Sequence, residues 1–158
     1  MRALLLAPLV LAGACSAPPT FPEPPPAVRA EVVAALAAYY DALSDRDWEA
    51  FAACFWPDAT ITTVWQPKGE PAPRVFASTI PEFVEKAPEG PGSQPIFEER
   101  MTAVEVRVHG NLAQAWAGYD AAFGDEQQLM RWSGVDGITL LEHDGTWKIT
   151  SIAFASDR

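Results

Sequence analysis

The fold is decided by the stretch VEVRVHGNL, which runs from Val104 to Leu112. Its valines alternate with Glu105 and Arg107, and this period of two is typical of a strand with one dry face and one wet face. The following residues HGN have the composition of a tight hairpin turn. The stretch therefore predicts two antiparallel strands joined by a short turn.

The same period of two continues on both sides of this turn. It begins near Ile96, and further turns at 124–126 and 143–145 divide the rest of the chain into strands over 112–123, 127–141 and 147–155. Glycines 118, 134 and 137 lie inside these strands and predict bulges or bends. Strands of this length twist and curl, so we expect a strongly curved sheet.

Helical spacing precedes the strands. Residues 28–43 carry apolar side chains on one helical face, and Asp47 is a suitable N-cap for a second, short helix. A strand over 59–66, a proline-rich loop over 67–74 and a third helix capped by Ser78 or Thr79 follow. Helices first and a long meander afterwards predict an α+β domain. In this domain about three helices pack on a mainly antiparallel sheet and enclose a cone-shaped apolar cavity.

The N-terminal residues 1–14 have the pattern of a secretory signal. One basic residue precedes an apolar run that is too short to cross a bilayer. The segment LAGAC, ending at Cys15, resembles the lipobox of bacterial lipoproteins, in which the cysteine is lipidated and becomes the new N-terminus. The resemblance implies a cell-envelope protein anchored by lipid at the outer membrane or cell surface. Ordinary secretion, to the periplasm or beyond, is the alternative.

Residues 16–27 are rich in proline, which fixes φ and lacks a backbone donor. We expect an extended tether that joins neither helix nor sheet. Residues 28–158 then form a single domain with one core, as the 49% share of hydrophobic residues and six tryptophans indicate.

Composition also excludes some partners and sites. The net charge of −10 argues against nucleic acid and against anionic lipid, so we expect membrane attachment through the lipid anchor alone. Cys54 has apolar neighbours and no histidine nearby, which predicts a buried, inert thiol. His109 and His143 fall at predicted turns without ligand spacing. We therefore expect no metal and no cofactor.

Two pairs of segments resemble a known group of proteins. Residues 38–51, AYYDALSDRDWEAF, and 55–61, FWPDATI, resemble the opening of the nuclear transport factor 2-like superfamily. Residues 134–141, GVDGITLL, and 144–149, DGTWKI, are similar to the last hairpin of its SnoaL-like branch. The resemblance covers 28–155 and implies the cone-shaped fold. That fold carries isomerases, cyclases, dehydratases and non-catalytic binders, so it leaves the function open.

The steroid isomerases of this superfamily provide one chemical test. They use an aspartate base and an oxyanion hole built from a tyrosine and a protonated aspartate. By resemblance, Tyr39 takes the tyrosine position and Asp136 that of the oxyanion acid, whereas the base position falls on Thr63. Threonine cannot accept a proton at neutral pH, so the resemblance implies a polar end to the pocket without the isomerase mechanism.

Two functions remain open. In the first, the domain binds a small apolar ligand or a partner segment without chemistry, in a pocket lined by Tyr40, Thr63, Trp65, Trp116 and Trp132. In the second, a SnoaL-type isomerase, dehydratase or cyclase uses Asp136 for proton transfer and Tyr39 as a hydrogen-bond donor. A buried Asp136 with a raised pKa favours the second, and a solvent-facing Asp136 excludes it. Core packing is the alternative role for the aromatic residues, and a sheet face that forms a homodimer is a third interpretation.

Overall fold

The computed structural model describes residues 22–66 and 69–157, so the predicted signal, Cys15 and the first half of the tether lie outside the described residues. In chain order, the elements are α1 Pro26–Asp45, α2 Trp48–Ala53, β1 Phe55–Trp65, β2 Arg74–Thr79, α3 Ile80–Lys86, the 3-10 turns Ala87–Glu89 and Pro91–Ser93, β3 Ile96–His109, β4 Leu112–Gly124, β5 Leu129–His143 and β6 Thr146–Ser156.

Helix α1 begins earlier than predicted. Pro26 occupies the first helical turn, where the missing N–H costs nothing and the fixed φ suits the helix. The expectation that the tether joins no helix is therefore wrong for its last two residues. At the other end Arg46 adopts a left-handed conformation with φ of 58°, and its N–H bonds to the carbonyls of Ala42 and Leu43.

The next elements are set by local chemistry. The Asp47 carboxylate accepts from the Ala50 N–H at 3.0 Å and caps α2, as predicted. Thr79 and Glu82 form a capping box at the start of α3, in which each side chain bonds to the backbone N–H of the other residue. Of the two predicted caps, the N-cap is therefore Thr79 and not Ser78. Strand β2 was not predicted. Its ladder partner is β1, and this pairing across a long loop leaves no strong local pattern in the sequence.

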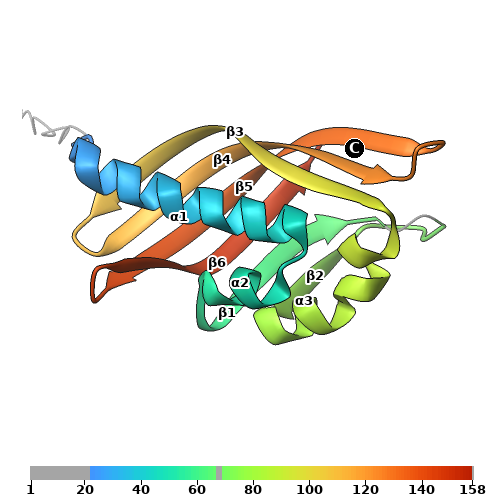
Figure 1. The fold of residues 1–158 in the computed structure, drawn as a ribbon, viewed down its shortest axis with the longest axis horizontal. Helices are drawn as coiled ribbons and strands as arrows, with labels where there is room; N and C mark the ends of the chain where they lie inside the picture. Colours follow the sequence, from blue (N-terminus) through green and yellow to red (C-terminus); the bar gives the residue numbers. More distant parts are fainter. Residues whose placement is uncertain (1–21, 67–68, 158) are drawn as a thin grey trace, which may run out of the picture.

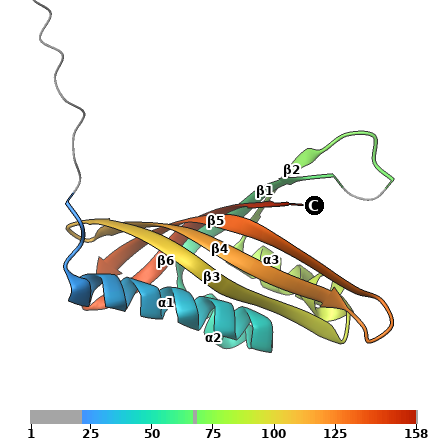
Figure 2. The same cartoon turned by 90° about the horizontal axis from the view of Figure 1, so that it is seen from above.

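The six strands form one sheet in the order β2-β1-β6-β5-β4-β3. Strands β1 and β6 run parallel, and every other neighbouring pair is antiparallel. The sheet curves, and α1 crosses its concave face with α2 and α3 beside it (Figures 1 and 2). The predicted α+β class, with helices on a curved and mainly antiparallel sheet, is confirmed.

The core lies between this concave face and the helices. On β4 the inward side chains include alanines 113, 115 and 117, which are buried and small enough for α1 to approach the sheet closely. Inward residues of β5 and β6, such as Ile138, Leu140 and Ile149, complete the layer. The alternation predicted from the sequence thus sets which face of each strand meets the helices.

Of the three glycines that predicted bulges or bends, Gly118 lies opposite a bulge, since it pairs with Ala103 next to the register shift on β3. Gly134 and Gly137 have another role. The register shifts fall at Phe55/Thr60, Met101/Ala103 and Thr139/Leu140. A Cβ at Gly134 would lie 2.5 Å from the Tyr119 hydroxyl, and one at Gly137 would lie 3.3 Å from the Trp116 ring. These two glycines therefore make room for aromatic rings, on opposite faces of the sheet.

Candidate functional site

Asp136 is the buried carboxylate of the concave face. It lies in the middle of β5, and its side chain is 2% exposed. Among the described residues, it is the one polar or charged residue that is buried. Its ladder neighbours are Ala117 on β4 and Phe154 on β6. A carboxylate in such apolar surroundings is costly unless it is hydrogen-bonded or protonated.

Tyr40 supplies the hydrogen bond. Its hydroxyl donates to Asp136 Oδ2 at 2.5 Å, across the gap between α1 and the sheet. The prediction that Tyr39 would be the donor beside Asp136 is not what the geometry gives. Tyr39 turns instead toward Phe51 and Phe55, with ring centroids 5.7 and 5.8 Å away. Adjacent helical residues point about 100° apart, so only one of the two tyrosines faces the carboxylate.

Burial changes the pKa values of Asp136, Tyr39 and Tyr40. Desolvation raises the pKa of Asp136 to about 6, and the hydrogen bond from Tyr40 opposes that shift. Desolvation and the Asp136 charge raise the pKa of both tyrosines well above the ordinary value of a phenol. The tyrosines therefore remain protonated donors at neutral pH, while Asp136 titrates near it.

The residues around this pair follow from strand register. Phe154 lies beside Asp136, Thr63 beside Phe154, and Phe76 beside Thr63, so one inward row crosses four strands. The Thr63 hydroxyl donates to the Phe154 carbonyl at 2.8 Å and is thereby held within the sheet. This row extends the site from the polar pair toward the β1–β2 end of the concave face.

Two predicted tryptophans lie on this same face. Trp132 is half-buried and packs against the core, two residues before Gly134. Trp65 is 45% exposed at the end of β1, with its ring 5.4 Å from that of Phe76. Tyr40, Thr63, Trp65 and Trp132 thus lie on the same side of the sheet as Asp136.

Trp116 does not belong to this site. It points to the outer face of β4, where it is 65% exposed, while its neighbours Ala115 and Ala117 face the core. The prediction that it lines the same pocket as Asp136 is wrong. The alternation of small buried residues along β4 could have revealed this, because residues of even number on that strand face outward.

Tyr119 and Glu99 are residues that the sequence interpretation missed. Tyr119 is buried on the inward face of β4, and its hydroxyl end lies over Gly134. Glu99 faces inward on β3, and its charge contributes to the raised pKa of Tyr40. The Ser44 hydroxyl donates to the Glu99 carbonyl at 2.8 Å and accepts from its N–H at 2.9 Å, which fixes α1 against this strand. Two features of the sequence indicate the position of Tyr119. It has the same odd numbering as the buried alanines of β4, and its partner on β5 is Gly134.

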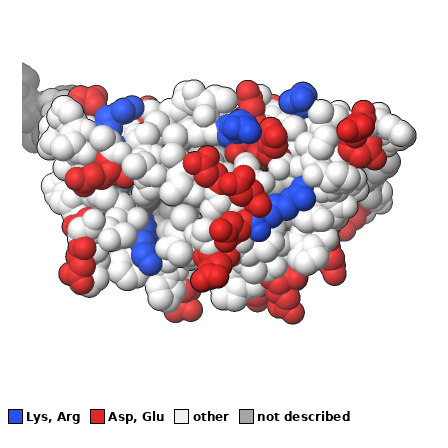
Figure 3. Space-filling model, in the orientation of Figure 1, with Lys and Arg blue, Asp and Glu red and all other residues white. Residues whose placement is uncertain are grey.

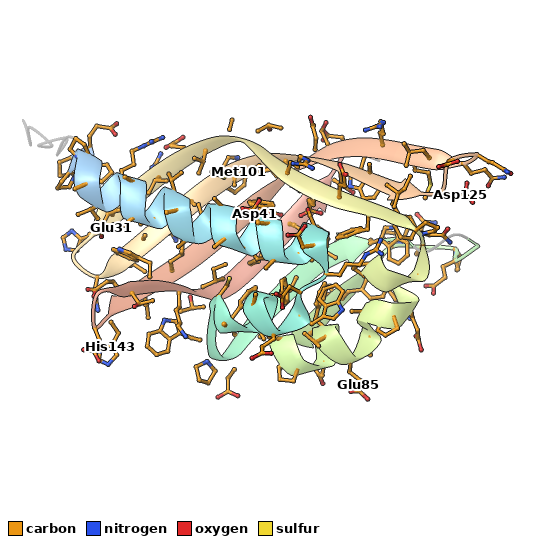
Figure 4. All side chains as sticks on the ribbon, viewed as in Figure 1. Glu31, Asp41, Glu85, Met101, Asp125 and His143 are labelled. Atoms are coloured by element: carbon orange, nitrogen blue, oxygen red, sulfur yellow. The ribbon has the colours of Figure 1, made fainter. Side chains whose placement is uncertain are left out.

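The remaining candidates lie elsewhere. His143 is at the β5–β6 turn, far from the α1–α2 corner (Figure 4), and approaches Asp144 at 3.4 Å. Over residues 22–66 and 69–157, no group of three or more His, Cys, Asp or Glu side chains could hold a metal ion. Cys54 is half-buried, its thiol donates to the Ala50 carbonyl, and burial raises its pKa. The raised pKa disfavours the reactive thiolate.

The surface and the helices carry two further observations. Acidic side chains outnumber basic ones on the face shown in Figure 3, in keeping with the net charge of −10. None of the helices within the described part of the chain is both long and apolar enough to span a membrane.

Comparison with known proteins gives the family. The model of the SnoaL-like domain matches residues 27–153. No curated protein matches the sequence. Among solved structures, a putative scytalone dehydratase from Novosphingobium aromaticivorans is similar, with a TM-score of 0.66 and 17% identity, covering 84% of this chain and 85% of that one.

Two further structures have the same fold. A hexachlorocyclohexane dehydrochlorinase, LinA-type3, from Novosphingobium barchaimii has a TM-score of 0.66 and 15% identity, covering 84% of this chain and 88% of that one. A protein of unknown function from Shewanella baltica, described as nuclear transport factor 2-like, has a TM-score of 0.62 and 17% identity, covering 84% and 95%. The chain therefore belongs to the SnoaL-like domain family, with a nuclear transport factor 2-like fold.

Proposed function

We propose that this chain is a cell-envelope lipoprotein whose domain binds a small, mostly apolar molecule on the concave side of the sheet. The observation that carries the proposal is the Tyr40–Asp136 pair, a hydrogen-bonded carboxylate surrounded by apolar side chains. Binding sites of this kind join an apolar wall to a few fixed polar groups that orient the ligand. The pair would accept one hydrogen bond from a ligand hydroxyl, or donate one to a ligand carbonyl when Asp136 is protonated.

The half-exposed aromatic residues support an apolar ligand. Trp65, Phe76 and Phe154 follow one another along the concave face on three different strands. Aromatic rings left partly in water gain free energy when a ligand covers them, at about 25 cal/mol per Å² of apolar surface removed from water. We therefore place the ligand between these rings and the Tyr40–Asp136 pair.

A neutral apolar dye, N-phenyl-1-naphthylamine, tests the proposed pocket. We expect saturable binding to the purified chain, weakened about tenfold by Trp65→Ala because one wall of the pocket is lost. Trp116→Ala, on the opposite face, is the matched control and should leave dye affinity unchanged. Equal effects of both substitutions, or no saturable binding by the wild type, would contradict the proposal. Native mass spectrometry of the same preparation would identify a co-purified ligand.

A second candidate function is proton-transfer catalysis of the isomerase or dehydratase kind. It is favoured by the burial of Asp136 and by its pKa of about 6, since a general base works best when its pKa is near the working pH. Tyr40, rather than Tyr39, would hold this base in position, because its one hydroxyl proton is donated to Asp136 Oδ2. Asp136→Asn should then lower kcat/KM for water elimination from a hydroxy-carbonyl compound by at least ~100-fold. Dye binding that persists in this variant would separate loss of chemistry from loss of the pocket.

The envelope anchor is a separate part of the proposal. It is supported by the signal-like residues 1–14, by Cys15 and by the proline-rich tether, and it would place the domain at the outer membrane or cell surface. Mass analysis of the mature N-terminus in cells checks it. A lipid-modified Cys15 agrees with the proposal, whereas an unmodified N-terminus at any other residue contradicts it.

A further inference from the structure

The outer face of the sheet carries an exposed tryptophan beside a hollow. Trp116 on β4 is 65% exposed, and a hollow of about 510 Å³ next to it is lined by residues of β3, β4 and β5. The described helices lie on the opposite face (Figure 2). An indole exposed to water does not gain the free energy of burial. Neither the core nor the concave site needs Trp116 at this position.

Strand register arranges the lining in two parallel rows. In the first row, Trp116 lies beside Glu105 on β3 and Gly137 on β5, and Ala153 on β6 follows. Because Gly137 has no side chain, the indole lies over it, with Cζ3 of the ring 3.3 Å from where a Cβ would stand. The first row is therefore a flat shelf made of one aromatic ring and two very small residues.

The second row offers hydrogen-bonding groups. Gln114 on β4 lies beside Arg107 on β3 and Thr139 on β5, and Ser151 on β6 and Thr60 on β1 continue the row. Each of these side chains faces outward, since the buried Ala115, Ile138, Ile152 and Ile61 alternate with them along their strands. An amide and three hydroxyl groups thus stand in line beside the flat shelf.

The charges at this site cancel. Both Nε and Nη2 of Arg107 donate to Glu105 Oε1, at 3.0 and 2.8 Å. The guanidinium is therefore already paired, and the net charge of −10 repels polyanions such as nucleic acid. A neutral ligand that is rich in hydroxyl groups fits this arrangement better than an anion.

A second hollow extends the site along the strands. It has a volume of about 250 Å³, shares Arg107 and Gln114 with the first, and reaches His109 and Leu112 at the β3–β4 hairpin. The adjoining hollows provide room for more than one ring of a chain-like ligand.

We propose that this outer face binds a neutral oligosaccharide. The weakly positive C–H face of a sugar ring would stack on the negative face of the Trp116 indole. Its hydroxyl groups would exchange hydrogen bonds with Gln114, Thr139 and the paired Arg107. A second copy of this chain is a poorer occupant, because the cores of protein interfaces are depleted of charged residues and the Glu105–Arg107 pair would have to be desolvated.

Titration of the full chain with neutral tetrasaccharides of glucose and of N-acetylglucosamine tests this proposal, followed by two-dimensional NMR of the tryptophan indole N–H signals. We expect a saturable shift of the Trp116 signal with at least one of these sugars. Trp116→Ala should weaken binding at least tenfold, and Thr139→Val, which keeps the side-chain shape, should weaken it several-fold. Trp65→Ala and Asp136→Asn, both on the concave face, are the controls and should leave sugar binding unchanged.

Three results would overturn the proposal. The first is that neither tetrasaccharide shifts the Trp116 signal at millimolar concentration. The second is that Trp65→Ala weakens sugar binding as much as Trp116→Ala, which would place the sugar on the concave face. The third is a wild-type dimer in analytical ultracentrifugation that Trp116→Ala converts to a monomer, which would make a second copy the occupant. Because the apolar dye probes the other face, failure of either proposal leaves the other standing.

Discussion

Replacing Phe51 by alanine is expected to lower the free energy of unfolding by about 3–5 kcal/mol, the usual cost of removing a buried phenyl ring from a core. Phe51 is 0% exposed although it belongs to a helix of only six residues. Its ring lies 5.0 Å from Phe55, 5.2 Å from Phe83 and 5.7 Å from Tyr39, measured between ring centroids. These contacts join α1, α2, α3 and the start of β1, so no single element can move to fill the cavity.

Urea unfolding followed by far-ultraviolet circular dichroism measures this effect. The matched control is Phe76→Ala, which removes the same ring from a half-buried position at the open end of the concave face. We expect the control to cost less than half as much, because less apolar surface returns to water. Equal costs for the two variants would mean that the cluster around Phe51 does not close the helical layer.

The same cluster explains which tyrosine serves the site. The rings of Phe51 and Phe55 hold Tyr39 in the core, and this fixes the rotation of α1 about its axis. Tyr40 is then aimed at Asp136. The family resemblance identified the right helix turn and the right carboxylate but the wrong one of two adjacent tyrosines. That choice depends on how the helix packs against the sheet, which the two adjacent tyrosines of the matched segment do not encode.

Elements governed by neighbouring residues were predictable from the sequence. The turn at Gly110, the caps at Asp47 and Thr79 and the antiparallel meander follow from chemistry within a few positions along the chain. Strand β2 was not, because it is a strand by virtue of its ladder with β1. The side of the sheet on which Trp116 lies is an intermediate case, less local than the caps and turns but more predictable than strand β2. The outward direction of this side chain follows from strand parity once the alternating alanines of β4 are assigned to the core.

The stability of the wild type is expected to fall relative to Asp136→Asn as the pH rises from about 4 to about 6. Burial raises the pKa of Asp136 from the ordinary 3.8 to about 6 in the folded chain. Between these values the folded state holds a proton that the unfolded state has lost, so raising the pH favours unfolding. A shift of about two pKa units corresponds to about 3 kcal/mol, fully lost from wild-type stability above pH 6.

Urea denaturation of wild type and Asp136→Asn at pH 4, 5, 6 and 7 isolates this effect, since the other carboxylates titrate equally in both proteins and cancel in the difference. Asp120→Asn is the control, because Asp120 lies on the neighbouring strand but is exposed, and its carboxylate accepts a hydrogen bond from the exposed Ser133 hydroxyl. Because this substitution lies on the surface, we expect it to change the free energy of unfolding less than Asp136→Asn does. A difference for Asp136→Asn that is constant, or that grows in favour of the wild type above pH 5, would mean that burial does not raise the pKa of Asp136. The proton-transfer role of the Tyr40–Asp136 pair would then lose its physical basis.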